Sequence, residues 1–385
     1  MFISRIELVN WRNFRSVAVD LRDRMFIVGP NASGKSNFLD VFRFLRDIAK
    51  AGGGLQKGID DRGGVSTLRC LSARRDPSIK IRVELKDDHA ETTPKWVYEI
   101  AFAQQTRGDR KPYLIREQVW EQGKCILDRP DKEDEKDKDR LTQTSLEQIN
   151  ANSGFREISR FFEKVTYLHL VPQLVRHPRE FSGPGISGDP FGRSFLERIG
   201  SVPEKTRKSR LATIEKSLQI AIPQLTKLEF VTDLKGGGIP HLEAVHEHWR
   251  PGAGKQRERE FSDGTLRLIG LLWSLLEGDS LLLLEEPELS LNSAIVEKLA
   301  PLFHRIQRQK KRQLLISTHS ADLLSDKGIA PEEVLLLEPR KEGTSVTTAS
   351  AIKDVTALLD AGMNIGETVL PRTRPSNINQ LTLFE

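Results

Sequence analysis

The chain has 385 residues, with 59 lysines and arginines against 54 aspartates and glutamates, a net charge of +5. This length allows two or three compact units with a sizeable core. Apolar residues make up 38% of the chain and charged residues 29%, values typical of a soluble, rather polar protein. The small positive excess leaves nucleic-acid binding open but does not argue for it.

The sequence shows no sign of membrane insertion or secretion. No apolar run approaches the roughly 18 residues that span a bilayer. The longest, 266–284, is interrupted by Arg267, Glu277 and Asp279. The N-terminus begins as an alternating strand and lacks the apolar core of a signal peptide. The two cysteines show no C-x-x-C spacing, which favours a reducing compartment and argues against zinc. We therefore expect a cytoplasmic protein.

The first elements predicted are two paired antiparallel strands, 3–9 and 17–21, and a short buried strand, 25–28. Residues 29–36 read Gly-Pro-Asn-Ala-Ser-Gly-Lys-Ser and fit G-x-x-x-x-G-K-[ST], the phosphate-cradling P-loop. Apolar residues at helical spacing predict a helix over 36–45. A glycine loop between a strand and a helix is the context that this motif requires.

Such a loop turns backbone N–H groups toward phosphate oxygens, and the helix N-terminus adds a favourable dipole. Lys35 would reach the β- and γ-phosphates, and Ser36 would hold Mg²⁺. The sequence therefore predicts an ATP and Mg²⁺ site whose nucleotide-binding residues are Gly29, Pro30, Asn31, Ala32, Ser33, Gly34, Lys35, Ser36 and Asn37.

The middle of the chain carries fewer functional signals. Residues 51–70 are rich in glycine and predict a loop, and three further strands, 79–85, 96–103 and 116–120, predict an antiparallel sheet. The charge run 131–140 is read as a solvated, mobile loop, with a regulatory patch as the alternative.

The next part is predicted to be mostly helical, from 154 to 222. Its helices are 155–164 and 207–222, and a Gly/Pro/Ser loop covers 182–192. Strands 228–232 and 242–246 follow around a turn at 236–238. From 261 onward the order helix, strand, helix, strand predicts an α/β layer.

The second half supplies the residues that a P-loop needs opposite it. The apolar strand 281–284 ends in Glu285 and Glu286, so one carboxylate would face Mg²⁺ and the other would orient the attacking water. A second apolar run, 314–317, ends before His319, which could hydrogen-bond a γ-phosphate; an ordinary surface histidine is the alternative. The segment 261–265, Phe-Ser-Asp-Gly-Thr, opens an apolar helix with free N–H groups, although helix capping alone would also explain it.

Together these segments resemble the ABC-type ATPase fold. FSDGT resembles its signature loop, LLLLEEPE its Walker B strand, ELSLN its D-loop and STHS its switch histidine. Asn13–Ser16 (NFRS) is similar to a segment of the RecF-like and SMC-like branch. The combination looks most like stand-alone prokaryotic ATPases related to the OLD and RecF families. The tail adds to the likeness: 331–338, then Gly343, then an acidic-apolar helix ending at 362–366. The implied fold is an α/β P-loop NTPase head with an antiparallel β lobe and an inserted, mostly helical arm.

The resemblance also implies roles for individual residues. ATP binds between two heads, so Ser262, Asp263, Gly264 and Thr265 would face the P-loop of a second copy. Glu286 and His319 would be catalytic, as the carboxylate and the γ-phosphate sensor, and Ser36 and Glu285 would hold Mg²⁺. Gln173, after a strand at 165–171, is the candidate for the family's Q-loop glutamine. Glu285 and Asn292 stand where many members have aspartate and histidine, which leaves the chemistry intact.

The resemblance divides the chain into four parts. Residues 1–60 would form lobe I, 61–245 a β-strand extension and helical insertion, 246–350 lobe II, and 351–385 a C-terminal helix and tail. The P-loop and the signature loop are much further apart than in transporter subunits, and no heptad repeat predicts the coiled coil of an SMC protein. An insertion of this size suits the repair and defence branch.

The partners expected follow from the same likeness. OLD nucleases carry a Toprim domain after the switch histidine, but 320–385 is short and has no Asp-x-Asp pair. We therefore expect a head that forms at least a dimer and controls a separately encoded effector, such as a Toprim-like nuclease, in antiviral defence. The alternative is a RecF-like DNA-binding protein of repair. An autonomous nuclease is a third reading that lacks metal carboxylates.

Smaller features have plain interpretations. Two basic stretches, 205–210 and 250–259, could bind DNA phosphates, but a solvated helix end or loop is favoured for each. His241, His246 and His248 lie near Glu243 and Glu247 without a recognised metal spacing, so a metal site is disfavoured.

Overall fold

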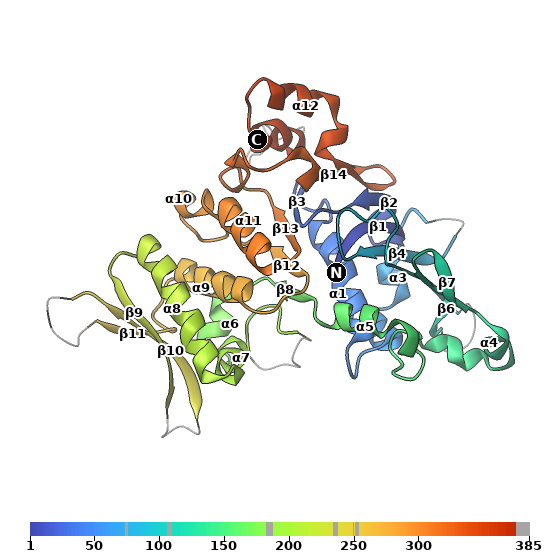
Figure 1. Cartoon of the computed structure of the whole chain (residues 1–385), viewed down its shortest axis with the longest axis horizontal. Helices are drawn as coiled ribbons and strands as arrows, with labels where there is room; N and C mark the ends of the chain where they lie inside the picture. Colours follow the sequence, from blue (N-terminus) through green and yellow to red (C-terminus); the bar gives the residue numbers. More distant parts are fainter. Residues whose placement is uncertain are drawn as a thin grey trace, which may run out of the picture.

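The structure is a computed structural model that describes residues 1–73, 76–105, 110–181, 188–233, 238–248, 250 and 254–374. The described residues form three sheets (Figure 1). A mixed sheet lies in the middle, an antiparallel sheet lies at one end, and an arm with a small sheet lies at the other end. Among the described residues no helix is long and apolar enough to cross a membrane.

The central sheet combines strands from distant parts of the chain. Its order is β15-β14-β3-β13-β12-β8, and all neighbours except β14 and β15 run parallel. Parallel strands buried on both faces are apolar throughout. Met25 and Ile27 accordingly face one core cluster, and Phe26 and Val28 face the other. The strands are β3 (Arg24–Val28), β8 (Thr166–Leu168), β12 (Leu282–Glu285), β13 (Leu314–Thr318), β14 (Val334–Arg340) and β15 (Gly343–Thr348).

The antiparallel sheet has the order β2-β1-β4-β5-β6-β7. Five of its strands follow the sequence prediction, and β7 was missed because Lys124, Cys125 and Ile126 are exposed and give no alternating pattern. The strands are β1 (Phe2–Trp11), β2 (Phe14–Asp20), β4 (Ile79–Lys86), β5 (Trp96–Gln104), β6 (Pro112–Glu121) and β7 (Lys124–Arg129).

Five helices accompany this sheet: α1 (Lys35–Ala49), α2 (Leu55–Asp60), α3 (Val65–Leu68), α4 (Lys132–Lys136) and α5 (Arg156–Glu163). The prediction of a loop over 51–70 is wrong, since α2 and α3 lie there. Their apolar residues Leu55, Ile59, Val65 and Leu68 are buried in the same cluster as α1. The glycines that flank these short helices obscured their apolar spacing.

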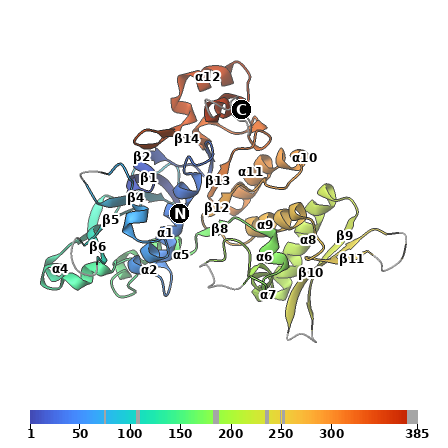
Figure 2. The ribbon, with the colours of Figure 1, turned by 180° about the vertical axis from the view of Figure 1, so that it is seen from behind.

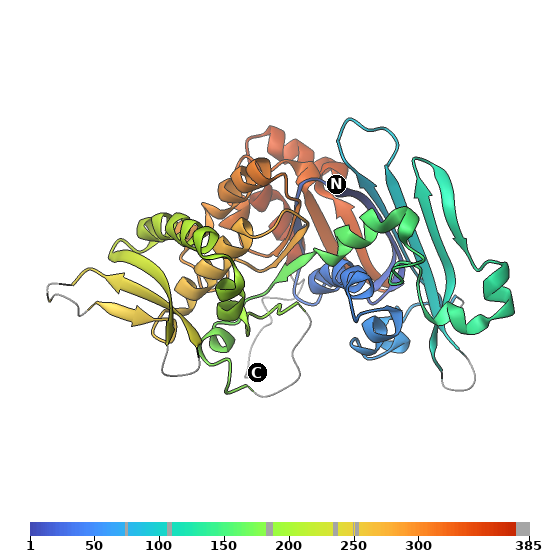
Figure 3. The same cartoon turned by 60° about the horizontal axis from the view of Figure 1, so that its bottom comes forward.

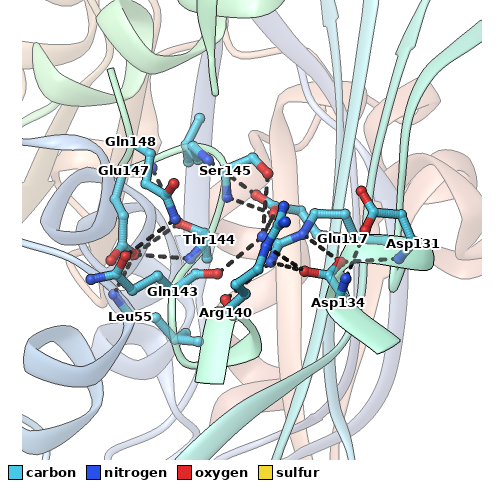
Figure 4. Close-up of polar contacts among 12 residues, drawn as sticks. Leu55, Glu117, Asp131, Asp134, Arg140, Gln143, Thr144, Ser145, Glu147 and Gln148 are labelled. Carbon is cyan, nitrogen blue, oxygen red and sulfur yellow. Dashed lines mark hydrogen bonds and ion pairs between the residues drawn. The ribbon is translucent and has the colours of Figure 1, made fainter. Parts of the chain in front are cut away.

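The charge run 131–140 is an ordered segment, so the mobile-loop prediction is wrong. Nine of its ten residues are exposed, but Asp134 is buried and caps α4 with Asp131. Arg129 on β7 donates to both oxygens of Asp134, at 2.8 and 3.0 Å. Figure 4 shows that Glu117, Asp134 and the segment 143–148 belong to one polar cluster. Composition alone does not reveal this buried partner.

The arm follows β8 and carries its own small sheet, β11-β10-β9 (Figure 3). Leu211, Ile214 and Leu218 recur at helical spacing on α8 and are buried in the second core cluster. This helix begins three residues before its predicted start. Of the predicted loop and turn, 182–187 and 236–237 lie outside the described residues. The elements are α6 (Pro172–Arg176), α7 (Phe195–Ser201), α8 (Glu204–Ala221), β9 (Leu225–Asp233), β10 (Ile239–His246), β11 (Lys255–Arg257) and α9 (Asp263–Leu276).

The remaining helices are α10 (Ser293–Val296), α11 (Leu299–Lys310), α12 (Lys353–Asp360) and α13 (Ile365–Val369). Seen from behind, α10 and α11 lie between the arm and α12 (Figure 2). The predicted helix through 362–366 is interrupted, because Gly362 adopts a φ of 95° and Asn364 caps a new helix, α13. The predicted domain boundaries stay predictions; the antiparallel sheet takes strands from both 1–60 and 61–245.

Candidate nucleotide-binding and catalytic site

The P-loop lies between β3 and α1, at the carboxyl edge of the central sheet. Gly34 precedes the helix with a φ of 96°, a left-handed conformation that side chains rarely adopt. A Cβ atom there would lie 2.1 Å from the side-chain nitrogen Nδ2 of Asn13, so the position also needs glycine for space. The sequence thus folds locally into the phosphate-binding loop that the motif predicts.

Asn13 fastens this loop to the rest of the site. Its Nδ2 donates to Ser33 O at 2.8 Å and to Thr344 Oγ1 at 2.7 Å, and its Oδ1 accepts from Asn37 Nδ2 at 2.8 Å. Thr344 Oγ1 in turn donates to Ser33 O at 2.9 Å. The NFRS segment was noted in the sequence only as a family likeness, and these bonds give its first residue a positioning role.

Lys35 folds back over the loop. Its Nζ donates to Gly29 O at 3.0 Å and to Pro30 O at 3.3 Å. Burial lowers the pKa of the Lys35 ammonium, while Glu286 and Glu285 lie close enough to act in the opposite direction. A phosphate can replace these carbonyl partners, because the ammonium is mobile on its stem and needs an anion.

Glu285 ends β12 beside the P-loop, as predicted for the carboxylate on the Mg²⁺ side. Ser36 Oγ donates to its Oε1 at 2.5 Å, and the hydroxyl of Tyr167 on β8 donates to its Oε2. A serine hydroxyl and one carboxylate, with phosphate oxygens, form the hard oxygen set that Mg²⁺ takes in nucleotide sites. The residues present therefore fit the metal, and Tyr167 is a partner that the sequence did not reveal.

Glu286 directly follows β12, and His319 directly follows the neighbouring strand β13, so the two residues lie together. His319 Nδ1 is 3.2 Å from Glu286 Oε1, and the backbone N–H of Glu286 donates to Ser317 O at 3.0 Å. Glu286 adopts a φ of 44°, a strained conformation for a non-glycine residue that is common at functional sites. The structure thus brings the predicted catalytic pair into contact.

The signature segment starts α9. Ser262 caps the helix, with its Oγ accepting from Thr265 N at 3.1 Å. A Cβ on Gly264 would lie 2.5 Å from Ser290 O, so this glycine allows the D-loop to pack against the helix start. The hydrogen bonds among the described residues join no signature residue to residues 29–37.

Gln173 lies on α6 beside the signature segment rather than beside Glu285. Its Nε2 is 3.5 Å from Asp263 Oδ2, and the neighbouring Arg176 donates to Asp263 Oδ1 at 2.6 Å and to Phe261 O at 2.6 Å. Just after β8, the ring of His169 contacts the backbone of Glu285, with His169 Nδ1 3.3 Å from Glu285 O. The Q-loop role of Gln173 stays a prediction.

Among the histidines of the arm, His241 has acidic partners, whereas Nδ1 of His246 is buried without a hydrogen-bond partner among the described residues. His241 is buried between Glu258, at 2.8 Å, and Asp233, at 3.3 Å. Within the described residues no group of three or more histidine, cysteine, aspartate and glutamate side chains could hold a metal ion.

Comparisons with known proteins agree with this geometry. A protein-family profile described as "AAA domain, putative AbiEii toxin, Type IV TA system" matches residues 24–326. No curated protein matches the sequence.

Among solved structures, an SMC head bound to the C-terminal winged-helix domain of ScpA is similar, with a TM-score of 0.51, 14% identity and coverage of 90% of this chain and 97% of that chain. The SMC head from Pyrococcus yayanosii has a TM-score of 0.51, 12% identity and coverage of 94% and 99%. The head from Pyrococcus furiosus, bound to the C-terminal domain of ScpA, has a TM-score of 0.50, 12% identity and the same coverage.

At these identities the structural likeness bears on the fold alone, whereas the profile covers most of the chain. The chain belongs to this AAA-domain family, and its fold is that of an ABC-type ATPase head of the SMC- and RecF-like class.

Proposed function

We propose that the chain is a molecular switch that binds and hydrolyses ATP and closes head to head around the nucleotide. The observation that carries the proposal is the convergence of three strand ends. The P-loop after β3, Glu285 and Glu286 at the end of β12, and His319 after β13 meet at one edge of the sheet. Ligands of open α/β sheets bind at the carboxyl ends of their strands.

Each residue has a task in this chemistry. The backbone N–H groups of 29–36 and the ammonium of Lys35 bind the phosphates, while Ser36 and Glu285 would hold Mg²⁺, which would neutralise charge on the β- and γ-phosphates. Glu286 orients a water molecule and accepts its proton as the water oxygen bonds to the γ-phosphorus. The bond to the bridging oxygen then breaks and leaves ADP and phosphate. His319 hydrogen-bonds the transferred group.

The switch would act on a separately encoded effector, such as a Toprim-like nuclease, in antiviral defence. The family description names a toxin of a type IV toxin–antitoxin system, and two similar SMC heads were solved with a domain of ScpA bound. Both descriptions favour heads that work with other proteins. Expression with the native flanking genes, followed by mass spectrometry of what co-purifies with and without ATP, would identify the effector.

The alternative is a RecF-like DNA-binding protein, and one surface favours it. His304, Arg305 and Arg308 on α11 line a cavity of about 530 Å³ that Asp326 also lines, and neither Arg305 nor Arg308 has an ion-pair partner among the described residues. By contrast, Arg207 in the basic stretch 205–210 packs over Phe230 and donates to Gly200 O. ATP-dependent duplex binding that weakens steeply with salt would support this alternative.

The ATPase proposal is tested with two variants and two neighbouring controls. Lys35→Ala is expected to lose nucleotide binding in calorimetry, because the phosphates lose their cation. Glu286→Gln is expected to bind ATP normally and to hydrolyse it at least 100-fold more slowly, a loss on the order of that for other catalytic groups. Lys298→Ala and Glu297→Gln change exposed charged residues that have no assigned role, and both variants should match the wild type. Rapid turnover by Glu286→Gln would refute the role of that carboxylate.

A further inference from the structure

A third carboxylate follows β12 and has no assigned task. Glu288 is 8% exposed, and its Oε1 accepts the hydroxyl proton of Thr318 at 2.5 Å. Its Oε2 is buried without a partner among the described residues. An unpaired buried oxygen is costly, so its retention beside a catalytic pair calls for a functional reason.

Thr318 links Glu288 to the switch histidine. It is the last residue of β13, and it directly precedes His319. While its hydroxyl donates to Glu288, its Oγ1 accepts from Ser320 N at 3.0 Å. The residues on both sides of His319 are therefore fixed by one hydroxyl group, and that hydroxyl is fixed by Glu288.

Glu288 also stands at the start of the D-loop. Its backbone oxygen accepts from Leu291 N at 3.1 Å, and Ser290 O lies against Gly264 at the signature helix. Glu288 thus connects the segment that packs against the signature loop with the loop that carries His319.

We propose that Glu288 is a positioning residue for ATP hydrolysis, which holds Thr318 so that His319 stays in contact with Glu286. This inference rests on the proposed ATPase function, but its geometric part concerns the nucleotide-free protein as well. Glu288 acts through Thr318 and His319 and touches no phosphate itself.

The charge state of Glu288 matters for this role. Burial raises the pKa of its carboxyl group; the hydrogen bond from Thr318 and the nearby His319 lower it, and Glu286 raises it further. Lys35 also interacts electrostatically with Glu288. When Glu288 is neutral, the His319 ring interacts with Glu286 alone. When Glu288 is ionised, its negative charge competes with that of Glu286 for the His319 ring. Hydrolysis is therefore expected to slow as the pH rises through the raised pKa.

The first experiment compares two substitutions of Thr318. Thr318→Val lacks the hydroxyl and is expected to lower kcat about tenfold, the effect of one lost hydrogen bond, with the Kd for ATP within twofold of wild type. Thr318→Ser restores the hydroxyl and should recover most of that loss. Thr356→Val, on the exposed side of α12, is the matched control. A fall in ATP affinity equal to the fall in kcat would overturn the proposal, because it would show a general structural effect.

The second experiment follows pH. In Glu288→Gln the amide oxygen still accepts from Thr318, but the side chain cannot ionise. Its kcat should therefore lack the decline that the wild type shows as the pH rises through the raised pKa of Glu288. Identical pH profiles for the two proteins would contradict the role of the carboxyl group.

The third experiment needs no hydrolysis. Histidine-selective ¹⁵N NMR of the nucleotide-free protein, assigned with His319→Gln, should show the His319 ring resonances shifted in Thr318→Val and restored in Thr318→Ser. Unshifted resonances in Thr318→Val would reject the positioning role even if the wild type proved to have no ATPase activity. Shifted resonances in a protein without ATPase activity would support the geometry and refute the proposed function alone.

Discussion

At the scale of single residues, Tyr167 is the least expected part of the site. Its hydroxyl donates to the Glu285 oxygen that Ser36 leaves free, and the guanidinium of Arg43 lies 4.3 Å from its ring centre. Burial raises the pKa of the Tyr167 phenol well above its usual range, so it remains a donor at every working pH. Under the proposed function, Tyr167 would orient the carboxylate that holds Mg²⁺ without binding the metal itself.

Replacing Tyr167 with phenylalanine should raise the Mg²⁺ concentration needed for half-maximal ATPase activity by about 10–100-fold, the usual effect of losing a group that orients a metal ligand. At saturating Mg²⁺ the rate should approach that of the wild type. Mg²⁺ titrations at fixed ATP measure both quantities, and Tyr113→Phe on β6 serves as the control. An unchanged Mg²⁺ requirement would exclude this role.

The difference between Lys35 and Tyr167 shows which residues a sequence can reveal. The P-loop is contiguous, so its eight residues can be recognised as one motif in the sequence. Glu285 and Glu286 were predicted because they follow an apolar strand. Tyr167 reaches Glu285 only because β8 pairs with β12, and Asn13 reaches Ser33 across the fold. Strand order is a tertiary property, and no local spacing encodes it.

At the scale of elements, the polar cluster of Figure 4 holds the charged segment on the antiparallel sheet. Glu117 on β6 is fully buried. Its oxygens accept from Ser145 N at 2.7 Å, from Leu146 N at 3.1 Å and from the Tyr98 hydroxyl at 3.1 Å. Arg129 donates to it at 3.1 Å. The prediction of a mobile loop over 131–140 failed because buried ion pairs join this charged segment to β6 and β7, which lie outside it.

Glu117→Ala is expected to destabilise the protein by about 3–5 kcal/mol, since it leaves buried N–H groups and part of the Arg129 charge without a partner. The midpoint of urea unfolding, followed by circular dichroism, measures the loss. Glu121→Ala, on an exposed position of the same strand, should have little effect. Equal midpoints for the two variants would show that the cluster does not stabilise the sheet.

At the scale of the whole molecule, no hydrogen bond among the described residues joins the signature segment to the P-loop. The P-loop, Glu285, Glu286 and His319 share one sheet edge, whereas the signature segment is bound to α6 through Arg176 and Asp263. The overall architecture was predicted from the resemblance of the P-loop, signature and Walker B segments together to the ABC-type ATPase fold. The compact arm with its own three-stranded sheet was only partly predicted, since its strands are half exposed.

This arrangement predicts that two copies complete each other's sites, and complementation tests it. Lys35→Ala removes the phosphate-binding cation of the P-loop. Ser262→Arg places a bulky cation where the γ-phosphate held by the partner would bind. If sites form in trans, mixing the two inactive variants creates one intact site per mixed dimer and restores ATPase activity. Sites that form within one chain would stay inactive on mixing, because each chain carries one defect. The Lys35→Ala/Ser262→Arg double variant mixed with Lys35→Ala should recover nothing, and Ser209→Arg on exposed α8 should remain active alone. Activity in the first mixture but not in the second would require a site shared between two heads.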